Sequence, residues 1–454
     1  MAIITTKKEE SGYELFKQRA KSKELFERRK RLVPDALTIF TPSTISGASG
    51  AIVTDVDGNQ LIDFTGGIGV LNAGHCPPTV VKAIQEQSAK FIHTCFGVAA
   101  YDLYLDVAEQ LIRLFPHGEA TKVMLTNSGA ESVENAIKIA RQATGRPAVI
   151  CFTGAFHGRT LMATTLTSKV NYKMGCGPFA PEVYRLEFPD VAHDANGRSE
   201  DEFADFHLKK LDEFFHYYVS EKNVAAIIIE CVQGEGGFNV APKKYIQGLR
   251  KVCDDYGIML VIDEVQTGFG RTGKWASYQH YGITPDLSTW AKSMASGMPL
   301  GAVIGKASVI DSINPGTIGG TYLGNPVCCA AAIATLNYMQ EIDINAKGNT
   351  VGEVIRNRFL ELKKKFPQHI SDVRGLGAMM AFEVSHDGAI QKPNGELTKQ
   401  LTQRCYEKGL IIISAGVNGN VVRVLSPLVI EEKDLKRGLD IIGESMEELS
   451  KAVH

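Results

Sequence analysis

Residues 258–268 read Ile-Met-Leu-Val-Ile-Asp-Glu-Val-Gln-Thr-Gly. Five apolar residues follow one another without alternation, and Asp263 comes directly after them. Unbroken apolarity over a strand-length run is typical of a strand buried on both faces, as in a parallel sheet covered by helices. The stretch therefore predicts an α/β fold, with Asp263 at the base of a cleft at the carboxyl end of a strand.

Three earlier segments have the same character, and they lie at residues 123–126, 148–152 and 224–229. Helical patterns alternate with these runs, so we expect a mostly parallel sheet with crossover helices on both faces. Residues 190–223 are polar and aromatic, and they are expected to form an excursion between two of the strands.

The beginning of the chain reads differently. Apolar residues within 11–32 recur at near-helical spacing, which predicts an amphipathic helix. Two short alternating runs within residues 50–64 flank the sequence Asp57-Gly58-Asn59, and this pattern indicates a β-hairpin.

The end of the chain also departs from the central pattern. It predicts a helix over 351–366, short strands near 378–384 and 410–414, and a terminal helix. We therefore expect three units: 1–75, an N-terminal segment that packs with the small domain; 76–338, a large α/β domain; and 339–454, a smaller α+β domain.

The composition argues against several classes of protein. Among 454 residues, 49 Lys and Arg face 51 Asp and Glu, so a net charge of −2 gives no field that would attract nucleic acid or an anionic membrane surface. The sequence contains no apolar run of the ~20 residues that span a bilayer, and no signal or transit pattern, so we expect a cytoplasmic location. The nine cysteines and eleven histidines are dispersed, which predicts buried thiols and no metal site.

Small, polar and ionisable residues follow each of the four predicted strands. Ligands in open α/β sheets bind beyond the carboxyl ends of the strands, so these residues are expected to converge on one site. The four segments are 127–131 (Asn-Ser-Gly-Ala-Glu), 153–159 (Thr-Gly-Ala-Phe-His-Gly-Arg), 230–237 (Glu-Cys-Val-Gln-Gly-Glu-Gly-Gly) and 263–268.

The first of these segments has the pattern of a helix start. Ser128 with Glu131 three residues later predicts a capping box, in which bare backbone N–H groups at the positive end of a helix suit a phosphate. An ordinary N-cap without a ligand explains the same pattern. Both interpretations stay open on this segment alone.

Asp263 and Lys292 carry the strongest chemical signal. A carboxylate at the base of a cleft costs desolvation energy unless a cation pairs with it, although a helix cap is an alternative. Lys292 stands among small and apolar residues in 289–299, where lost solvation lowers the pKa of an amine toward its nucleophilic form. A surface lysine is the competing interpretation.

One motif points elsewhere. The sequence Gly268-Phe-Gly-Arg-Thr-Gly-Lys274 matches glycine-rich phosphate loops of dinucleotide enzymes and of P-loop nucleotide hydrolases. Trp275 stands where a P-loop needs a Ser or Thr hydroxyl for Mg²⁺, and five residues separate the glycines from the strand. Because of these two departures, the motif is only weak support for nucleotide hydrolysis.

Taken together, the segments resemble the class III, fold-type I aminotransferases that use pyridoxal phosphate, and especially the 4-aminobutyrate aminotransferases. The likeness runs along nearly the whole chain, in order. The matching segments are 66–75, 126–131, 154–159, 229–237, 263–273, 291–293, 319–326 and 372–377. The resemblance implies the fold-type I architecture, a mostly parallel sheet with helices on both faces plus a smaller α+β domain, and pyridoxal 5'-phosphate as the cofactor.

The resemblance also implies roles for individual residues. Lys292 would form a Schiff base with the cofactor, and Asp263 would pair with the pyridine nitrogen and keep it protonated. The other implied cofactor contacts are Ser128, Gly129 and Ala130 for the phosphate, Phe156 stacked on the ring, His157 as a further contact, Gln266 at the ring hydroxyl, and Thr321 at the phosphate of the neighbouring subunit. The last contact implies a homodimer or a dimer of dimers.

The substrate contacts are implied by the same resemblance. Arg159 would hold a distal carboxylate by a bidentate contact, and Arg423 would hold the α-carboxylate of 2-oxoglutarate. Glu235 would neutralise Arg423 when the donor has no α-carboxylate. Ile68 would line the substrate site, where ornithine aminotransferases carry an aromatic residue. Either arginine could instead be a surface or salt-bridge residue.

The expected function is pyridoxal-phosphate-dependent transamination of 4-aminobutyrate, or a close ω-amino acid, with 2-oxoglutarate, giving the semialdehyde and glutamate. The expected partners are a small-molecule amino donor and a 2-oxo acid acceptor. A racemase or epimerase is the alternative, because residues 296–299 (Ser-Gly-Met-Pro) resemble the epimerases of this class and Cys231 replaces the usual Pro. Another ω-amino acid or a diamine as donor is also open.

Overall fold

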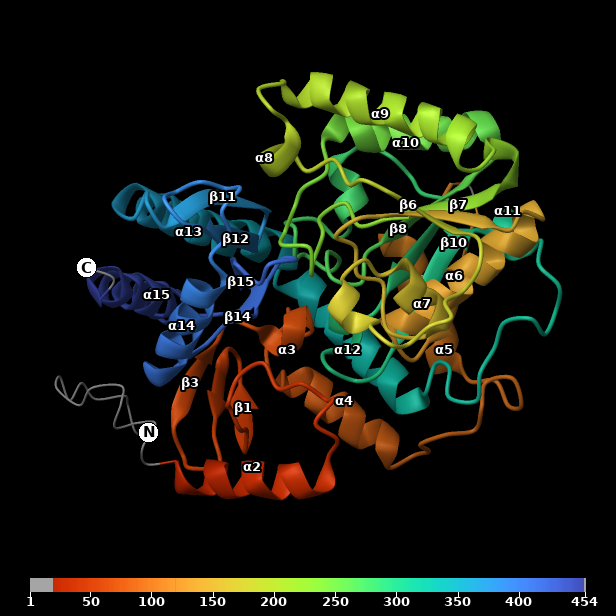
Figure 1. Ribbon diagram of the computed structural model, residues 1–454. Helices are drawn as coiled ribbons and strands as arrows, with labels where there is room; N and C mark the ends of the chain where they lie inside the picture. The colour runs from red at the N-terminus through yellow and green to blue at the C-terminus, as the bar shows by residue number, and fades with distance from the viewer. Residues whose placement is uncertain (1–18, 119, 453–454) are drawn as a thin grey trace.

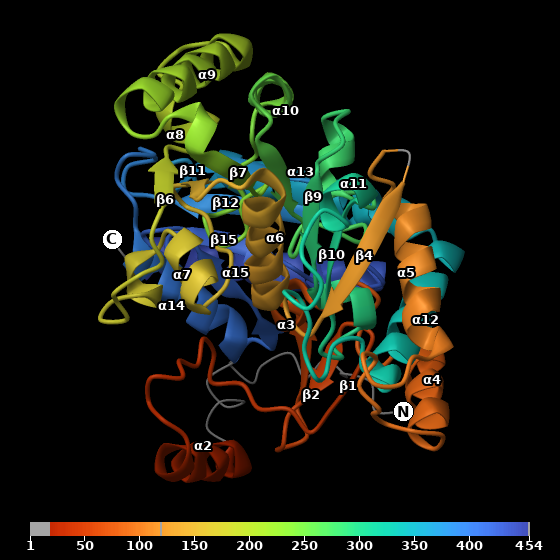
Figure 2. The ribbon, with the colours of Figure 1, turned by 90° about the vertical axis from the view of Figure 1, so that its right-hand side faces the viewer.

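The computed structural model describes residues 19–118 and 120–452 (Figure 1). A large central sheet lies on one side of the molecule, and the C-terminal elements lie on the other (Figures 1 and 2). The N-terminal strands pack beneath both parts (Figure 1). Within the described residues, no helix is both long enough and apolar enough to cross a bilayer.

The central sheet has seven strands and is mostly parallel. In spatial order they are β4 (Thr121–Thr126), β10 (Gly301–Lys306), β9 (Leu287–Trp290), β8 (Met259–Asp263), β7 (Val224–Ile229), β5 (Ala148–Phe152) and β6 (Val183–Leu186). Strand β10 pairs antiparallel with β4 and with β9, and the remaining pairs of neighbours in this sheet are parallel. The α/β prediction is confirmed.

The four predicted strands correspond to β4, β5, β7 and β8. The sequence prediction missed β6, β9 and β10. Polar residues interrupt the apolar run in β6 (Val-Tyr-Arg-Leu) and β9 (Leu-Ser-Thr-Trp), and glycines flank it in β10. Tertiary packing buries all of β9 despite its two hydroxyl side chains.

Helices cover both faces of this sheet, which explains its unbroken apolar strands. On β7, Ile227 shares a core with residues of α10 (Lys243–Tyr256), and the next residue, Ile228, shares a second core with α6 (Gly129–Thr144). Successive side chains therefore enter opposite layers. The other helices of this part are α4 (Pro78–Ser88), α5 (Asp102–Leu114), α7 (Leu161–Leu166), α8 (Val191–Asp194), α9 (Glu200–Tyr217), α11 (Ala307–Ile310) and α12 (Pro326–Glu341).

Helices α8 and α9 lie between β6 and β7 in the chain, which confirms the predicted excursion over 190–223. Three-residue and four-residue 3₁₀ turns complete this part. They are η1 (Val170–Tyr172), η2 (Glu221–Asn223), η3 (Ser277–His280) and η4 (Lys292–Ala295).

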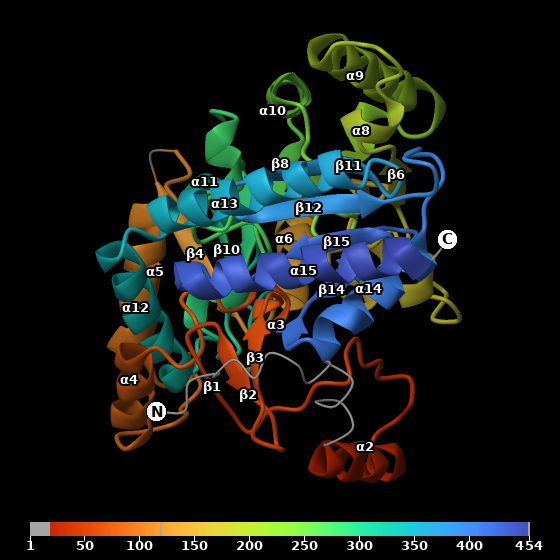
Figure 3. The same cartoon turned by 90° about the vertical axis from the view of Figure 1, so that its left-hand side faces the viewer.

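The C-terminal part contains an antiparallel sheet in the order β11 (Ile370–Leu376), β12 (Met379–Val384), β15 (Val421–Val424) and β14 (Ile413–Ala415). Its helices are α13 (Ile344–Lys365), α14 (Gly395–Glu407) and α15 (Glu432–Ala452). Figure 3 shows α13 and α15 running along this sheet. The predicted terminal helix and strands are present, and the predicted 351–366 helix begins earlier, at Ile344.

A third sheet joins the two ends of the chain. Strands β1 (Gly47–Ser49), β2 (Ile52–Thr54) and β3 (Gln60–Asp63) are antiparallel, which confirms the predicted hairpin, and β3 pairs in parallel with β13 (Leu410–Ile411). Helix α2 (Ala20–Leu32) covers the later part of the predicted 11–32 helix, and residues 11–18 lie outside the described residues. The three domain boundaries stay a prediction.

Candidate active site

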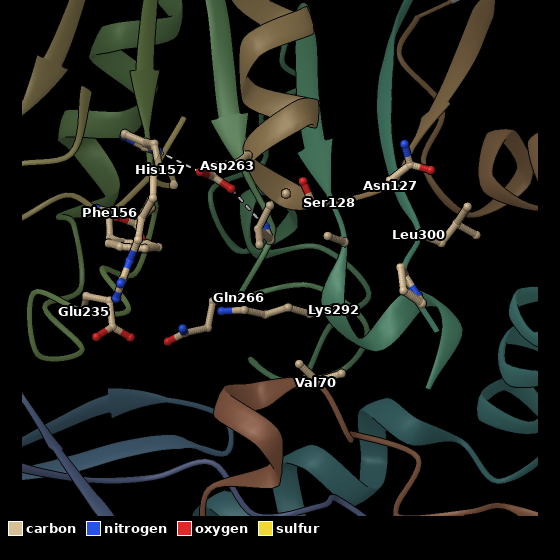
Figure 4. Close-up of a pocket in the computed structure, with 18 of the residues that line it drawn as sticks. Val70, Asn127, Ser128, Phe156, His157, Glu235, Asp263, Gln266, Lys292 and Leu300 are labelled. Carbon is tan, nitrogen blue, oxygen red and sulfur yellow. Dashed lines mark hydrogen bonds and ion pairs between the residues drawn. The ribbon is translucent and has the colours of Figure 1, made fainter. Parts of the chain in front are cut away.

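A cavity of about 420 Å³ lies at the carboxyl ends of β4, β5, β7 and β8. Residues that come after each of these four strands line it, as the strand-end argument requires (Figure 4). The sequence-predicted residues that line the cavity are Ser128, Gly129, Ala130, Phe156, His157, Arg159, Glu235, Asp263, Gln266 and Lys292.

Asp263 is the last residue of β8, and its side chain is buried. Its Oδ2 lies 2.7 Å from Nδ1 of His157, and its Oδ1 accepts the N–H of Val265 at 3.0 Å (Figure 4). The sequence predicted that the Asp263 carboxylate needs a paired cation, and the imidazole of His157 supplies part of that pairing. Nε2 of His157 is buried and has no hydrogen-bond partner among the described residues.

Lys292 begins the turn η4 and points into the cavity (Figure 4). Its φ of 49° lies in the left-handed region, which costs a non-glycine residue about 1–3 kcal/mol and is common at functional sites. Burial lowers the pKa of its amine to about 8, although the nearby Glu235 carboxylate opposes this shift. The surface-lysine interpretation is therefore wrong.

The N-terminus of α6 forms one wall of the cavity. Oγ of Ser128 accepts the N–H of Glu131 at 3.2 Å, but the Glu131 carboxylate accepts the N–H of Asn127 at 2.8 Å. The predicted capping box is therefore wrong in its second half, because the return bond reaches one residue further. The first-turn N–H groups of Gly129 and Ala130 have no partner inside a helix and line the cavity.

Glycine is required at the start of α6. A Cβ at Gly129 would lie 2.8 Å from Cγ1 of Val265, in the loop after β8. The absence of a side chain thus brings the helix N-terminus close to the loop that begins after Asp263.

Two arginines differ in their surroundings. Arg423 on β15 is 2% exposed, and its Nη1 lies 2.7 Å from Oε1 of Glu235 and donates to the carbonyl of Gly234 at 3.2 Å. Burial alone would raise the pKa of Glu235, but the contacts with Arg423, together with the charges of Lys292 and Lys169, lower it. Arg159 is exposed and lines the cavity, with its guanidinium 4.6 Å from the ring centroid of Tyr172. Arg159 is therefore available to an anion, whereas Arg423 is occupied.

Three predicted residues are not part of the cavity wall. Arg423 lies behind Glu235, with which it is paired. Ile68 is partly buried, with φ of 67°, and packs against the cluster that contains Phe238 and Leu425. Thr321 is exposed in the loop before α12.

Sequence reasoning gave no individual role to several other residues of the site. Glu230 comes directly after β7, the same signal that identified Asp263, and it lines the cavity. Its carboxylate accepts the N–H groups of Phe156 and Gly234, both at 3.0 Å, and burial raises its pKa to about 7. Tyr172 lies in a short 3₁₀ turn away from any strand end, so no pattern could have identified it. Val70, Asn127, Met298 and Leu300 also line the cavity.

The glycine-rich motif after β8 serves packing. A Cβ at Gly268 would lie 2.6 Å from the Trp290 ring, and one at Gly270 would lie 3.0 Å from the Ile344 side chain. Lys274 is exposed and donates to the carbonyl of Gln279 at 3.2 Å. These contacts leave no room for a phosphate at those glycines. Within residues 19–118 and 120–452, no group of three or more His, Cys, Asp or Glu side chains is arranged to hold a metal ion.

The cavity residues fit pyridoxal phosphate. An amine of lowered pKa suits the aldehyde, a buried carboxylate suits a protonated ring nitrogen, and a helix N-terminus suits the phosphate. Oε1 of Gln266 is buried and has no hydrogen-bond partner within the described part of the chain, so it can accept from a ring hydroxyl.

Comparison with known proteins gives a consistent result. The model of the family "Aminotransferase class-III" matches residues 38–446. The chain is 44% identical to the 5-aminovalerate aminotransferase of Pseudomonas aeruginosa over 94% of its own length and 98% of that protein. It is 43% identical to the 4-aminobutyrate aminotransferase of Escherichia coli, over 94% of its length and 99% of that protein.

A solved structure of similar fold is the taurine:2-oxoglutarate aminotransferase from Bifidobacterium kashiwanohense, in complex with PLP and glutamate. It has 26% identity and a TM-score of 0.88, covering 95% of this chain and 98% of that chain. With the family model matching most of its length, this chain belongs to the class-III aminotransferases.

Proposed function

We propose that this protein transfers the amino group of an ω-amino acid, 4-aminobutyrate or 5-aminovalerate, to 2-oxoglutarate, giving the semialdehyde and glutamate. The observation that carries the proposal is one cavity lined by Lys292, Asp263 and an open arginine, Arg159, with Glu235 in its wall paired to Arg423 behind it. The names of the relatives support the same donors.

As a class-III aminotransferase the protein uses pyridoxal 5'-phosphate, which supplies an aldehyde for amine exchange and a ring that accepts an electron pair from a substrate carbon. Asp263, oriented by His157, would hold the proton of the ring nitrogen. The N–H groups of Gly129 and Ala130 and the Ser128 side chain would bind the phosphate. Gln266 would accept from the ring hydroxyl, and Phe156 would contact the ring.

Lys292 moves the proton. With the cofactor bound, its amine would act as the base that takes the proton from the substrate carbon and as the acid that releases it again. The lowered pKa lets this amine act as a base near neutral pH. The named relatives are aminotransferases and do not favour epimerisation.

The two arginines explain how one cavity can bind both substrates. Arg159 binds the distal carboxylate that ω-amino acids and 2-oxoglutarate share, by a bidentate contact. When an ω-amino acid is bound, Glu235 neutralises Arg423, and the reacting carbon is left without a carboxylate. When 2-oxoglutarate is bound, its α-carboxylate takes the place of Glu235 at Arg423.

A donor panel tests this function. Purified enzyme with added cofactor is incubated with 2-oxoglutarate and either 4-aminobutyrate, 5-aminovalerate, ornithine or a simple amine, and glutamate is measured. We expect the two ω-amino acids to give the largest kcat/KM. A preference for a donor without a carboxylate would contradict the role of Arg159.

We also propose that the chain forms a homodimer and acts in the cytoplasm. Thr321 is exposed next to apolar surface that includes Tyr322 and Ile92, 63% and 61% exposed, which suits a second copy of the chain. We therefore propose a homodimer whose Thr321 reaches the partner's phosphate site. All nine cysteines are free thiols, which suits the reducing cytoplasm. Light scattering of the wild type and of Tyr322→Glu tests the dimer.

A further inference from the structure

Tyr172 contacts both Arg159 and Glu235, two of the residues proposed to bind substrate. Its ring lies under the guanidinium of Arg159, 4.6 Å away, and meets the Phe156 ring edge-on at 5.3 Å. Its hydroxyl donates to Oε2 of Glu235 at 3.4 Å. One side chain thus links the open arginine to the carboxylate that occupies the other arginine.

The Glu235 carboxylate is divided between two partners. Oε1 pairs with Arg423 at 2.7 Å, and Oε2 accepts from Tyr172. Glu235 lines the cavity, whereas Arg423 is almost fully buried behind it. A substrate carboxylate can therefore reach Arg423 only when Glu235 turns away.

A displaced Glu235 needs a new partner, because an unpaired carboxylate in a closed site is costly. The 3.4 Å contact with Tyr172 is long for an O–H···O bond, whose usual length is about 2.7–2.8 Å, so the carboxylate can approach the hydroxyl as it leaves Arg423. Burial, followed by Glu235 itself, raises the pKa of Tyr172, so the hydroxyl stays protonated and donates.

Lys169 adds positive charge on the same side. Its Nζ donates to the carbonyl of Gly416 at 3.1 Å and lies 5.7 Å from the Tyr172 ring centroid. Its charge contributes to the lowered pKa of Glu235, after the larger effects of Arg423 and Lys292. A carboxylate that turns toward Tyr172 therefore stays near a cation.

We propose that Tyr172 is a specificity-determining positioning residue, whose hydroxyl receives the Glu235 carboxylate when the α-carboxylate of a 2-oxo acid binds Arg423. Tyr172 thereby allows one cavity to take a donor without an α-carboxylate and an acceptor with one. The inference rests on the proposed function for the identity of these two substrates.

The test compares two inert ligands on the cofactor-loaded enzyme by calorimetry. Glutarate carries both carboxylates, and valerate carries only the one that Arg159 binds. Tyr172→Phe keeps the ring contacts and removes the hydroxyl. We expect glutarate affinity to fall about tenfold, the effect of losing one hydrogen bond to a charged group, and valerate affinity to fall much less. The KM for 2-oxoglutarate should rise by a similar factor.

Tyr184→Phe is the matched control, because its hydroxyl also donates to a carboxylate, Oε2 of Glu182 at 3.1 Å, but on β6 outside the cavity. It should bind both ligands as the wild type does. Equal losses of glutarate and valerate in Tyr172→Phe, or no loss of glutarate, would overturn the inference.

A double variant isolates the contact. Glu235→Gln removes the charge that Tyr172 is proposed to receive, so adding Tyr172→Phe to it should not weaken glutarate binding further. A second tenfold loss would contradict the inference. Failure of the proposed function would appear separately, as a wild type that makes no glutamate from ω-amino acids, because the ligand comparison involves no turnover.

Discussion

Oδ2 of Asp263 and Nδ1 of His157 lie 2.7 Å apart, and both side chains are buried. The pair comes from two nearby strand ends, those of β8 and β5, with only β7 between them in the sheet. The imidazole fixes the carboxylate, whose remaining lone pairs can accept a proton donor in the cavity.

Replacing this carboxylate should abolish most of the activity. Asp263→Asn keeps the shape but removes the charge that holds a proton on the ring nitrogen, so we expect kcat to fall about 10³-fold. Asp311→Asn, which alters an exposed ion pair with Lys122, serves as the control and should retain full activity. Steady-state kinetics with saturating cofactor measures both variants, and an active Asp263→Asn enzyme would contradict the assignment.

Lys292→Ala should remove the visible absorbance band of the cofactor-loaded enzyme together with its activity, because Lys292 supplies the only lysine amine among the residues that line the cavity. The control is Lys274→Ala, in the glycine-rich motif, which should keep both properties. Spectra after gel filtration check the result. A colourless Lys274→Ala protein would instead revive the phosphate-loop interpretation of that motif.

The reactivity of Lys292 should depend on pH in a specific way. Its pKa of about 8 means that the ammonium predominates below that pH and the nucleophilic amine above it. The rate at which apoenzyme reacts with added pyridoxal phosphate should therefore rise with pH and level off above about 8, and not near the ~10.4 of an ordinary lysine. Glu235→Gln removes a charge that raises this pKa, so the midpoint should move lower. A midpoint that stays put or rises would contradict this account.

Arg159→Lys should separate binding from chemistry. A lysine keeps the charge but cannot reproduce the bidentate contact, so we expect kcat/KM for 4-aminobutyrate to fall about tenfold or more. Donors that lack the distal carboxylate should be unaffected. Arg113→Lys, on α5 and away from the cavity, is the matched control. A uniform loss over all donors would show that Arg159 has a structural role.

A partly buried ion network between the large and the C-terminal parts should contribute to stability. His193 on α8 lies 2.9 Å from Asp190 and 3.0 Å from Glu383 on β12, and these bonds raise its pKa to about 10. Despite burial, the same contacts and Arg374 lower the pKa of Glu383 to about 2.

The sign of the pH dependence is set by these shifts. The contribution of His193 is complete below its unfolded pKa of ~6.5 and is lost as pH rises toward about 10, while that of Glu383 is lost as pH falls toward about 2. His193→Gln should lower the free energy of unfolding by about 2 kcal/mol near pH 6 and by less at pH 9. Urea unfolding at both pH values, with exposed His216→Gln as control, measures this. A pH-independent loss would show that the network carries no charge.

Much of the site could be predicted from local sequence. Unbroken apolar runs identify β4, β5, β7 and β8, and parallel strands bring the residues after their carboxyl ends to one edge of the sheet, so Asp263, His157 and Ser128 could be identified. Glu230 carried the same signal, but sequence reasoning gave it no individual role. The second hydrogen bond of the predicted capping box is absent, because the Glu131 carboxylate accepts from the N–H of Asn127 and not from that of Ser128. The sequence pattern is the same for both bonds.

The sequence by itself determined the α/β class, the strand ends that meet in the cavity and the lysine that faces them, because these depend on periodicity and on neighbours along the chain. Only the tertiary structure decided that Arg423 is buried behind Glu235 and that Tyr172 joins Glu235 to Arg159. These contacts unite a second sheet, a loop and a 3₁₀ turn. Their geometry depends on how separate layers pack, and no spacing within one segment records it.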